Sequence, residues 1–264
     1  MAFELKANEA VCDGITRNVR SQIEKALSYL GTEGPPAKRK PHTRTPSDND
    51  AVSEVRKCFK RIRAALRLVR EDLGDDLYHE ENLCFRDAGR PLTLVRDADV
   101  LVETAEKLAQ QYPGAIEPGA FAKLRETLLA NRQEVTRRVL GEDNAFAAVE
   151  EVATRALVRL PDWRFERDDW AAVEQGLRHV YREGHRALAL AAEVPNVANL
   201  HEWRKQAKYL WHELQLLGGA WTGSEKELVD RTHRLSTLLG EDHDLAVLRE
   251  RSPPIRSLTA VTAS

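Results

Sequence analysis

Apolar residues recur every three or four positions along most of the chain, which is the period of an amphipathic α-helix. Residues 15–30 show this pattern, with apolar side chains at Ile15, Val19, Ile23, Ala26, Leu27 and Leu30. No stretch shows the two-residue alternation of a half-buried strand, and no glycine-rich phosphate loop is present. The pattern therefore predicts an all-α fold of long antiparallel helices.

Interruptions of the pattern divide the chain into separate helices. We expect helices at about residues 15–30, 53–72, 76–88, 92–111, 119–140, 143–159, 168–192, 197–217 and 224–249. The second helix should be capped by Asp50 or Ser53. Pro91 should break or kink the chain between residues 76–88 and 92–111, because proline has no amide hydrogen to donate.

Two segments lack the helical pattern. Residues 31–50 hold four prolines and almost no apolar side chain, so we interpret them as a flexible linker. Residues 251–264 are neither periodic nor apolar and are predicted to form a disordered tail. Residues 1 to about 250 are predicted to form one domain, which contains the flexible linker 31–50.

Charge is balanced over the whole chain but not along it. The sequence has 40 Lys and Arg residues against 42 Asp and Glu residues, a formal net charge of −2. Any anion-binding role must therefore come from local clusters. Residues 54–70 hold seven cations and one acid, Glu54, and Arg56, Lys60, Arg63 and Arg67 share one helix face. Because like charges at these spacings repel each other, we expect an anionic ligand there, with an ordinary solvated face as the alternative.

Three further predicted helices also carry cationic faces. If these faces converge, they form a positive groove whose guanidinium forks and ammonium groups match phosphate oxygens. The candidate anion-binding residues are Arg17, Arg20, Arg56, Lys57, Lys60, Arg61, Arg63, Arg67, Arg178, Arg182, Arg186, His201, Arg204, Lys205 and Lys208.

The chain contains an internal repeat. The basic segment SEVRKCFKRIR (53–63) has the order of charges of HEWRKQAKYLWH (201–212). The acidic segment LVRDADVL (94–101) returns as LGEDHDLAVL (239–248), so that Asp97 and Asp99 correspond to Asp242 and Asp244. Two matches in similar register predict two related helical bundles, at about residues 1–140 and 143–250.

Metal binding is the first function that the histidines suggest. His201 and His212 would lie about 16 Å apart along a helix, too far to share an ion, and Arg204 and Lys208 between them repel cations. The acids of residues 241–244 could hold Mg²⁺ or Ca²⁺, but pairing with arginines between helices or capping of turns is the stronger interpretation. We therefore expect no metal and no other cofactor.

Catalysis and nucleic-acid binding compete with anion binding as interpretations of the sequence. No nucleophile motif or paired acid and base is present, so we expect a binding protein and not an enzyme. Nucleic acid is also a polyanion, yet no helix-turn-helix or RNA-recognition pattern occurs and the chain is not basic overall. A helical scaffold whose charges only direct assembly stays open as well.

The expected location is the cytoplasm. Three scattered cysteines without a CxxC motif are typical of a reducing compartment. The first residues lack the apolar centre of a signal peptide, and no run approaches the length of a membrane span.

In combination these segments resemble the CHAD family, the conserved histidine α-helical domain. The resemblance is carried by HEWRKQAKYLWHEL (201–214), by GLRHVYREGHRAL (176–188) before it, and by RDADVL (96–101) and LGEDHDLAVL (239–248). It spans about residues 1–250 apart from the linker. It implies two pseudo-symmetric four-helix bundles with a basic groove between them, binding of inorganic polyphosphate, and association with polyphosphate granules.

The family's His-x-x-Arg-x-x-x-Lys helix corresponds to His201, Arg204 and Lys208 in the second half of the chain. In the first half it corresponds to Arg56 and Lys60, with Ser53 in place of the histidine.

Two further features depart from the family pattern. Tyr209 and Trp211 occupy positions that are often basic in the second repeat. The chain also stops soon after residues 239–248, which predicts an incomplete second bundle or one that a second copy completes, so a homo-oligomer stays open.

Overall fold

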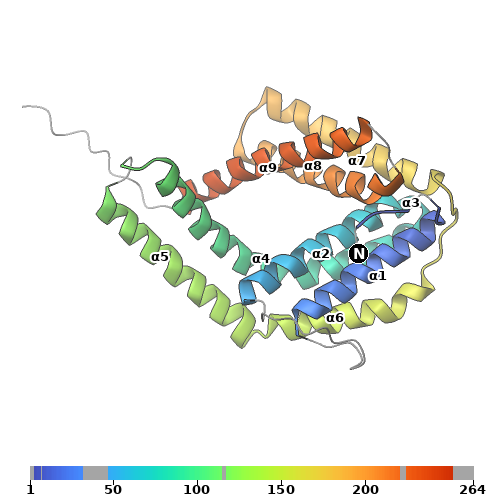
Figure 1. The fold of residues 1–264 in the computed structure, drawn as a ribbon, viewed down its shortest axis with the longest axis horizontal. Helices are drawn as coiled ribbons and strands as arrows, with labels where there is room; N and C mark the ends of the chain where they lie inside the picture. Colours follow the sequence, from blue (N-terminus) through green and yellow to red (C-terminus); the bar gives the residue numbers. More distant parts are fainter. Residues whose placement is uncertain (1–2, 7, 32–46, 115–116, 221–223, 252–264) are drawn as a thin grey trace, which may run out of the picture.

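The computed structural model describes residues 3–6, 8–31, 47–114, 117–220 and 224–251, and every regular element in them is helical (Figure 1). The long helices are α1 (Val11–Tyr29), α2 (Asp48–Leu68), α4 (Asp75–Gln111), α5 (Pro118–Thr136), α6 (Ala145–Arg159), α7 (Ala171–Glu193), α8 (Val197–Leu217) and α9 (Ser224–Arg251). The short elements are α3 (Arg70–Leu73), a π-helical turn η2 (Arg137–Glu142), and the 3₁₀ turns η3 (Leu160–Asp162) and η4 (Gly218–Ala220). The all-α prediction is confirmed. No helix in the described part of the chain combines the length and apolarity needed to cross a membrane.

The long helices pack as two groups. In the first group, α1, α2, α4 and α6 surround the main apolar core, which includes Ile15, Ile62 and Phe85. In the second group, α8 packs between α7 and α9 (Figure 1). The groups meet where α2 contacts α7 and α8, and where α4 contacts α9. Helix α6 lies beyond the repeat boundary expected near residues 140–143, yet it packs against α1 and α4 of the first group.

Helix α2 begins earlier than predicted. Ser47 is its N-cap and forms a capping box with Asp50, in which each side chain accepts a hydrogen bond from the other residue's amide. The prediction that Asp50 or Ser53 caps this helix is therefore wrong, because both residues lie inside it. Residues 48–50 are helical and do not belong to a linker. Arg251, the first residue of the expected tail, is helical and ends α9. The linker residues 32–46 and the tail residues 252–264 lie outside the described residues.

Pro91 does not interrupt the chain, which corrects the predicted break between residues 88 and 92. Helix α4 runs for 37 residues through this proline. Pro91 lacks the amide that would bond to the carbonyl of Asp87, but both residues are exposed, so water can satisfy that carbonyl. Phe85 and Leu92 pack into the same core on either side of the proline, and this packing keeps the helix continuous.

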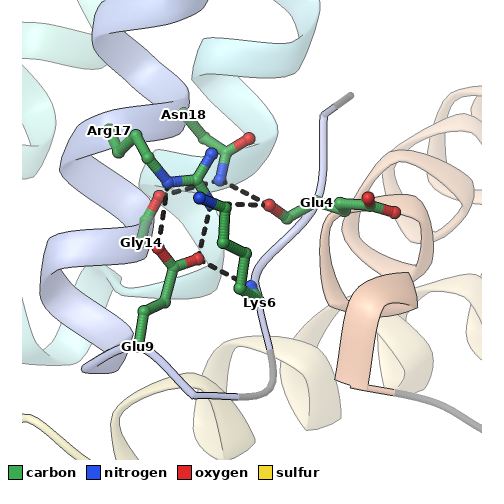
Figure 2. Close-up of polar contacts among 6 residues, drawn as sticks. All are labelled: Glu4, Lys6, Glu9, Gly14, Arg17 and Asn18. Atoms are coloured by element: carbon green, nitrogen blue, oxygen red, sulfur yellow. Dashed lines mark hydrogen bonds and ion pairs between the residues drawn. The ribbon is translucent and has the colours of Figure 1, made fainter. Parts of the chain in front are cut away.

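An N-terminal segment ties the two groups together. The amide of Leu5 donates a hydrogen bond of 2.6 Å to the carbonyl of Leu216, near the end of α8. The carbonyl of Glu4 accepts hydrogen bonds from the side chains of Arg17 and Asn18 on α1, and Arg17 also pairs with Glu9 (Figure 2). Arg17 is thus engaged in holding this segment in place.

Close backbone packing joins α7 to α2. A Cβ atom added to Gly176 would lie 2.2 Å from the carbonyl oxygen of Leu68, a distance that no side chain can accommodate. A Cβ atom at Gly184, two turns further along the same helix, would come no closer than 3.8 Å to Gln206.

We predict that Gly176→Ala lowers the free energy of unfolding by about 3 kcal/mol, because it forces α7 away from α2. The matched variant Gly184→Ala should be neutral or stabilising by up to about 1 kcal/mol, since alanine favours a helix. Urea denaturation followed by circular dichroism measures both changes. Equal effects of the two substitutions would show that α7 and α2 are not in close backbone contact.

Candidate functional site

Helices α2 and α8 turn cationic side chains toward each other. We call Arg56, Lys60, Arg63 and Arg67 of α2, with Arg204 and Lys208 of α8, the cation cluster. Burial lowers the pKa of Lys60 well below its usual value, and Lys208, Arg56 and Arg204 lower it further. Burial likewise lowers the pKa of Lys208 to about 8, with Arg204, Arg56 and Arg96 adding to the effect. These lysines therefore lie in a partly desolvated, strongly positive environment.

None of the six cluster side chains forms an ion pair with a carboxylate in the described part of the chain. Elsewhere in the protein, two buried acids are each paired with an arginine. Glu81 binds Arg159 at 2.8 Å, and Asp72 binds Arg167 at the same distance. The missing partners are thus a property of this site and not of the whole fold.

Neutral groups hold the cluster arginines in position. Nε of Arg63 donates a 3.0 Å hydrogen bond to the side-chain oxygen of Asn82, and the guanidinium of Arg67 lies 3.6 Å from the ring centre of Tyr209. Buried nitrogens of Arg56, Arg67 and Arg204 have no hydrogen-bond partner among the described residues. Because a buried donor without a partner is costly, these atoms are ready to bind an acceptor.

Two acids flank the cluster without neutralising it. Asp97 partly opposes the lowering of the pKa of Arg56 and Lys60, and Asp244 does the same for Lys208. Both come from the acidic segments of the repeat, but they do not correspond to each other in the predicted alignment. The residue that corresponds to Asp244 is Asp99, which is buried and accepts a hydrogen bond from Asn49.

A cavity of about 460 Å³ lies between α2 and α4, beside the cluster. We call it the α2–α4 cavity. It is lined by Arg56, Phe59, Lys60, Arg63, Phe85, Arg86, Gly89, Arg90 and Thr93. Five of these residues are cations and none is an acid, so the cavity is suited to an anion.

Sequence reasoning missed the contribution of α4. Arg86 and Arg90 line the cavity, and Arg96 adds to the positive field at Lys208. The four-residue spacing of Arg86 and Arg90 was a usable signal. The neighbouring acids Asp87 and Asp97 concealed it, because they give the segment a mixed charge.

Most of the remaining candidate residues are engaged outside the cluster. Four of them form ion pairs in which both partners belong to the same helix. These pairs are Lys57 with Glu54, Arg178 with Glu174, Arg186 with Glu183, and Lys205 with Glu202. Arg182 donates to the backbone carbonyl of Arg178, and Arg61 lies over the ring of Phe3. Arg20 is partly buried on α1. The cationic face of α7 is therefore exposed and compensated by its own acids.

The two histidines of α8 have different environments. His201 is exposed and packs against His243 of α9, with 3.4 Å between their Nδ1 atoms. Burial, His243 and Arg204 lower the pKa of His201. His212 is 4% exposed and neither ring nitrogen has a partner among the described residues. Burial together with Lys208, Arg61 and Lys60 lowers the pKa of His212 well below its usual value, so this imidazole is neutral.

No group of three or more His, Cys, Asp or Glu side chains is arranged to hold a metal ion within the described ranges. The cluster itself offers nitrogen donors that carry positive charge. Charge and hydrogen bonds make such a site suited to anions.

Comparisons with known proteins agree with the fold. The sequence model of the CHAD domain family matches residues 37–252. The structure resembles the crystal structure of the CHAD domain from the plant Ricinus communis with a TM-score of 0.62 and 18% sequence identity. That match covers 94% of this chain and 79% of the plant domain, and at this identity it shows a shared fold. No curated protein sequence matches the chain.

We predict that Lys208→Met raises the free energy of unfolding at low salt by about 1 kcal/mol, because it removes one charge from a crowded, partly buried cluster. The control is Lys205→Met on the same helix, where the lysine is 41% exposed and paired with Glu202. That change should stay within about 0.5 kcal/mol. Urea denaturation measures both, and a marked loss of stability in Lys208→Met would mean that this lysine supports the fold.

Proposed function

We propose, from the premise that this chain belongs to the CHAD domain family, that it is a non-enzymatic module that binds inorganic polyphosphate. One observation carries the proposal: six cations face one another across α2 and α8 without a paired carboxylate among the described residues. A linear polyanion would relieve their repulsion at several points at once. Arginine forks suit phosphate oxygens, and the lysines act as point charges.

The proposed partner also accounts for the arrangement of the cluster along α2. Arg56, Lys60, Arg63 and Arg67 occupy successive turns, so they present charge along a line and not at one point. Consecutive phosphoryl groups of one chain would meet consecutive side chains. A protein of this kind would act in the cytoplasm and associate with polyphosphate granules.

We expect the triple variant Arg56→Gln, Lys60→Gln, Arg204→Gln to bind long-chain polyphosphate at least tenfold more weakly than the original protein. By analogy with nucleic acids, the slope of log affinity against log salt should become shallower by about one for each lost contact. Isothermal titration calorimetry at several salt concentrations measures both quantities.

The control removes the same number of charges from the outer face of α7. Arg178→Gln, Arg182→Gln, Arg186→Gln should leave the affinity nearly unchanged, because these exposed side chains bond within their own helix. Equal losses in the two triple variants would show that net charge alone drives binding. Single-stranded DNA that binds as tightly as polyphosphate would indicate a general polyanion site, and no binding of either would favour a scaffold.

The affinity for polyphosphate should fall as the pH rises through about 8, measured between pH 7 and 9.5. The bound anion requires the protonated ammonium of Lys208, whereas the free protein loses that proton around a pKa of about 8. Lys60 loses its proton early for the same physical reason, so the fall should be broad. Lys208→Arg, which stays charged, should weaken this pH dependence, and an unchanged profile in that variant would show that the titration of Lys208 does not cause the fall in affinity.

A further inference from the structure

The α2–α4 cavity is closed on its inner side by aromatic rings. Phe59 and Phe85 are 3% and 1% exposed and pack edge to face with 5.3 Å between ring centres. Both belong to the main apolar core, so the inner wall of the cavity is solid. Gly89 lets α4 approach Phe59 closely on this side, since a Cβ atom there would already lie 3.3 Å from the ring of Phe59. A ligand that enters this cavity therefore cannot pass through to the core side.

Cations surround the open part of the cavity. Arg56, Lys60 and Arg63 come from α2, and Arg86 and Arg90 come from α4. Arg86 also pairs with exposed Asp87, whereas Arg90 has no ion pair among the described residues. Nη1 of Arg56 is buried and lacks a hydrogen-bond partner among the residues that the structure describes. The cavity thus concentrates positive charge around one pocket that is closed on its inner side, while the cation cluster spreads it along a line.

We propose that the α2–α4 cavity seats one end of the polyphosphate chain, so that the protein recognises the terminal phosphoryl group. This inference rests on the proposed function and adds the part of the ligand that is recognised. Arg56 and Lys60 belong both to the cavity and to the cation cluster. A chain whose end lies in the cavity would therefore continue along α2 toward Arg204 and Lys208.

The chemistry of polyphosphate favours its terminal phosphoryl group over an interior one as the occupant of the α2–α4 cavity. An interior phosphoryl group has one ionised oxygen and two bridging oxygens, so it can occupy the cavity only if the chain leaves again. A terminal group resembles a phosphate monoester, with a second pKa near 6 and a charge of about −1.5 to −2 at neutral pH. Five cations around one cavity favour the group with the higher charge. The volume of about 460 Å³ also exceeds what one such group needs, given that a water molecule takes roughly 30 Å³ in the liquid.

The first experiment measures how many protein molecules bind one chain of polyphosphate. Chains of defined, increasing length are mixed with protein at concentrations that fill only the tight sites of free-ended chains, and the complexes are sized by sedimentation velocity. End recognition predicts at most two protein molecules per chain at every length, because each chain has two ends. Binding along the interior predicts a number that grows with chain length.

The second experiment blocks both ends of the chain by converting the terminal groups to phosphoramidates of an uncharged amine. We expect blocked chains to bind at least tenfold more weakly than free-ended chains of the same length. Arg90→Gln, a change within the cavity only, should weaken binding of free-ended chains and leave the affinity for blocked chains unchanged. Lys107→Gln, an exposed change on the same helix, is the matched control and should affect neither.

The outcomes separate the two proposals. A stoichiometry that grows with chain length, or equal binding of blocked and free chains, would overturn end recognition and leave polyphosphate binding intact. Failure of the unaltered protein to bind either kind of chain would overturn the proposed function itself.

Discussion

Mutual repulsion among the cations between α2 and α8 is the constraint on which the rest of this structure depends. Lys208 lowers the pKa of Lys60, and Arg56 and Arg204 lower the pKa of both lysines. Such a site is stable only if the helices that carry the charges are held together by something else. The opposite side of α2 supplies much of that stabilisation, because Ile62 and Leu66 are fully buried in the main core. Repulsion among the cluster side chains lowers the stability of the fold, and such a loss of stability is typical of a surface that binds a ligand.

Several contacts outside the cluster hold the two helix groups in place. The N-terminal segment bonds to α1 and to the end of α8 together, and Gly176 allows α7 to touch the backbone of α2. Arg17 takes part in this framework through Glu9 and the carbonyl of Glu4 (Figure 2). The geometry of the cluster is therefore set by residues that need not contact a ligand.

A buried acid near the cluster does not reduce its charge. Glu213 is fully buried on α8, and neither of its oxygens has a hydrogen-bond partner among the described residues. Burial raises the pKa of this carboxyl group well above its usual value, and Arg67 opposes that rise only in part. Burial therefore favours the neutral form of this carboxyl group, and it favours the neutral imidazole of nearby His212 as well. The positive potential of the cluster thus comes from its lysines and arginines without a buried counter-charge.

The sequence by itself determined the helical fold, the approximate limits of most helices, and the cationic stripe of α2. These features follow from local periodicity, since residues three and four apart share a helix face wherever the helix lies. Only the tertiary structure decided which faces meet. Arg204 and Lys208 approach α2, whereas Arg178 and Arg186 repeat the same spacing on an exposed face and pair with acids of their own helix. Arg90 joins the site, and Pro91 stays within a helix, because packing of α4 on the core overrides local charge and local propensity. The spacing of residues along one helix carries no information about which side chains a neighbouring helix places against it. For this reason the contacts between helices could not be predicted from local periodicity.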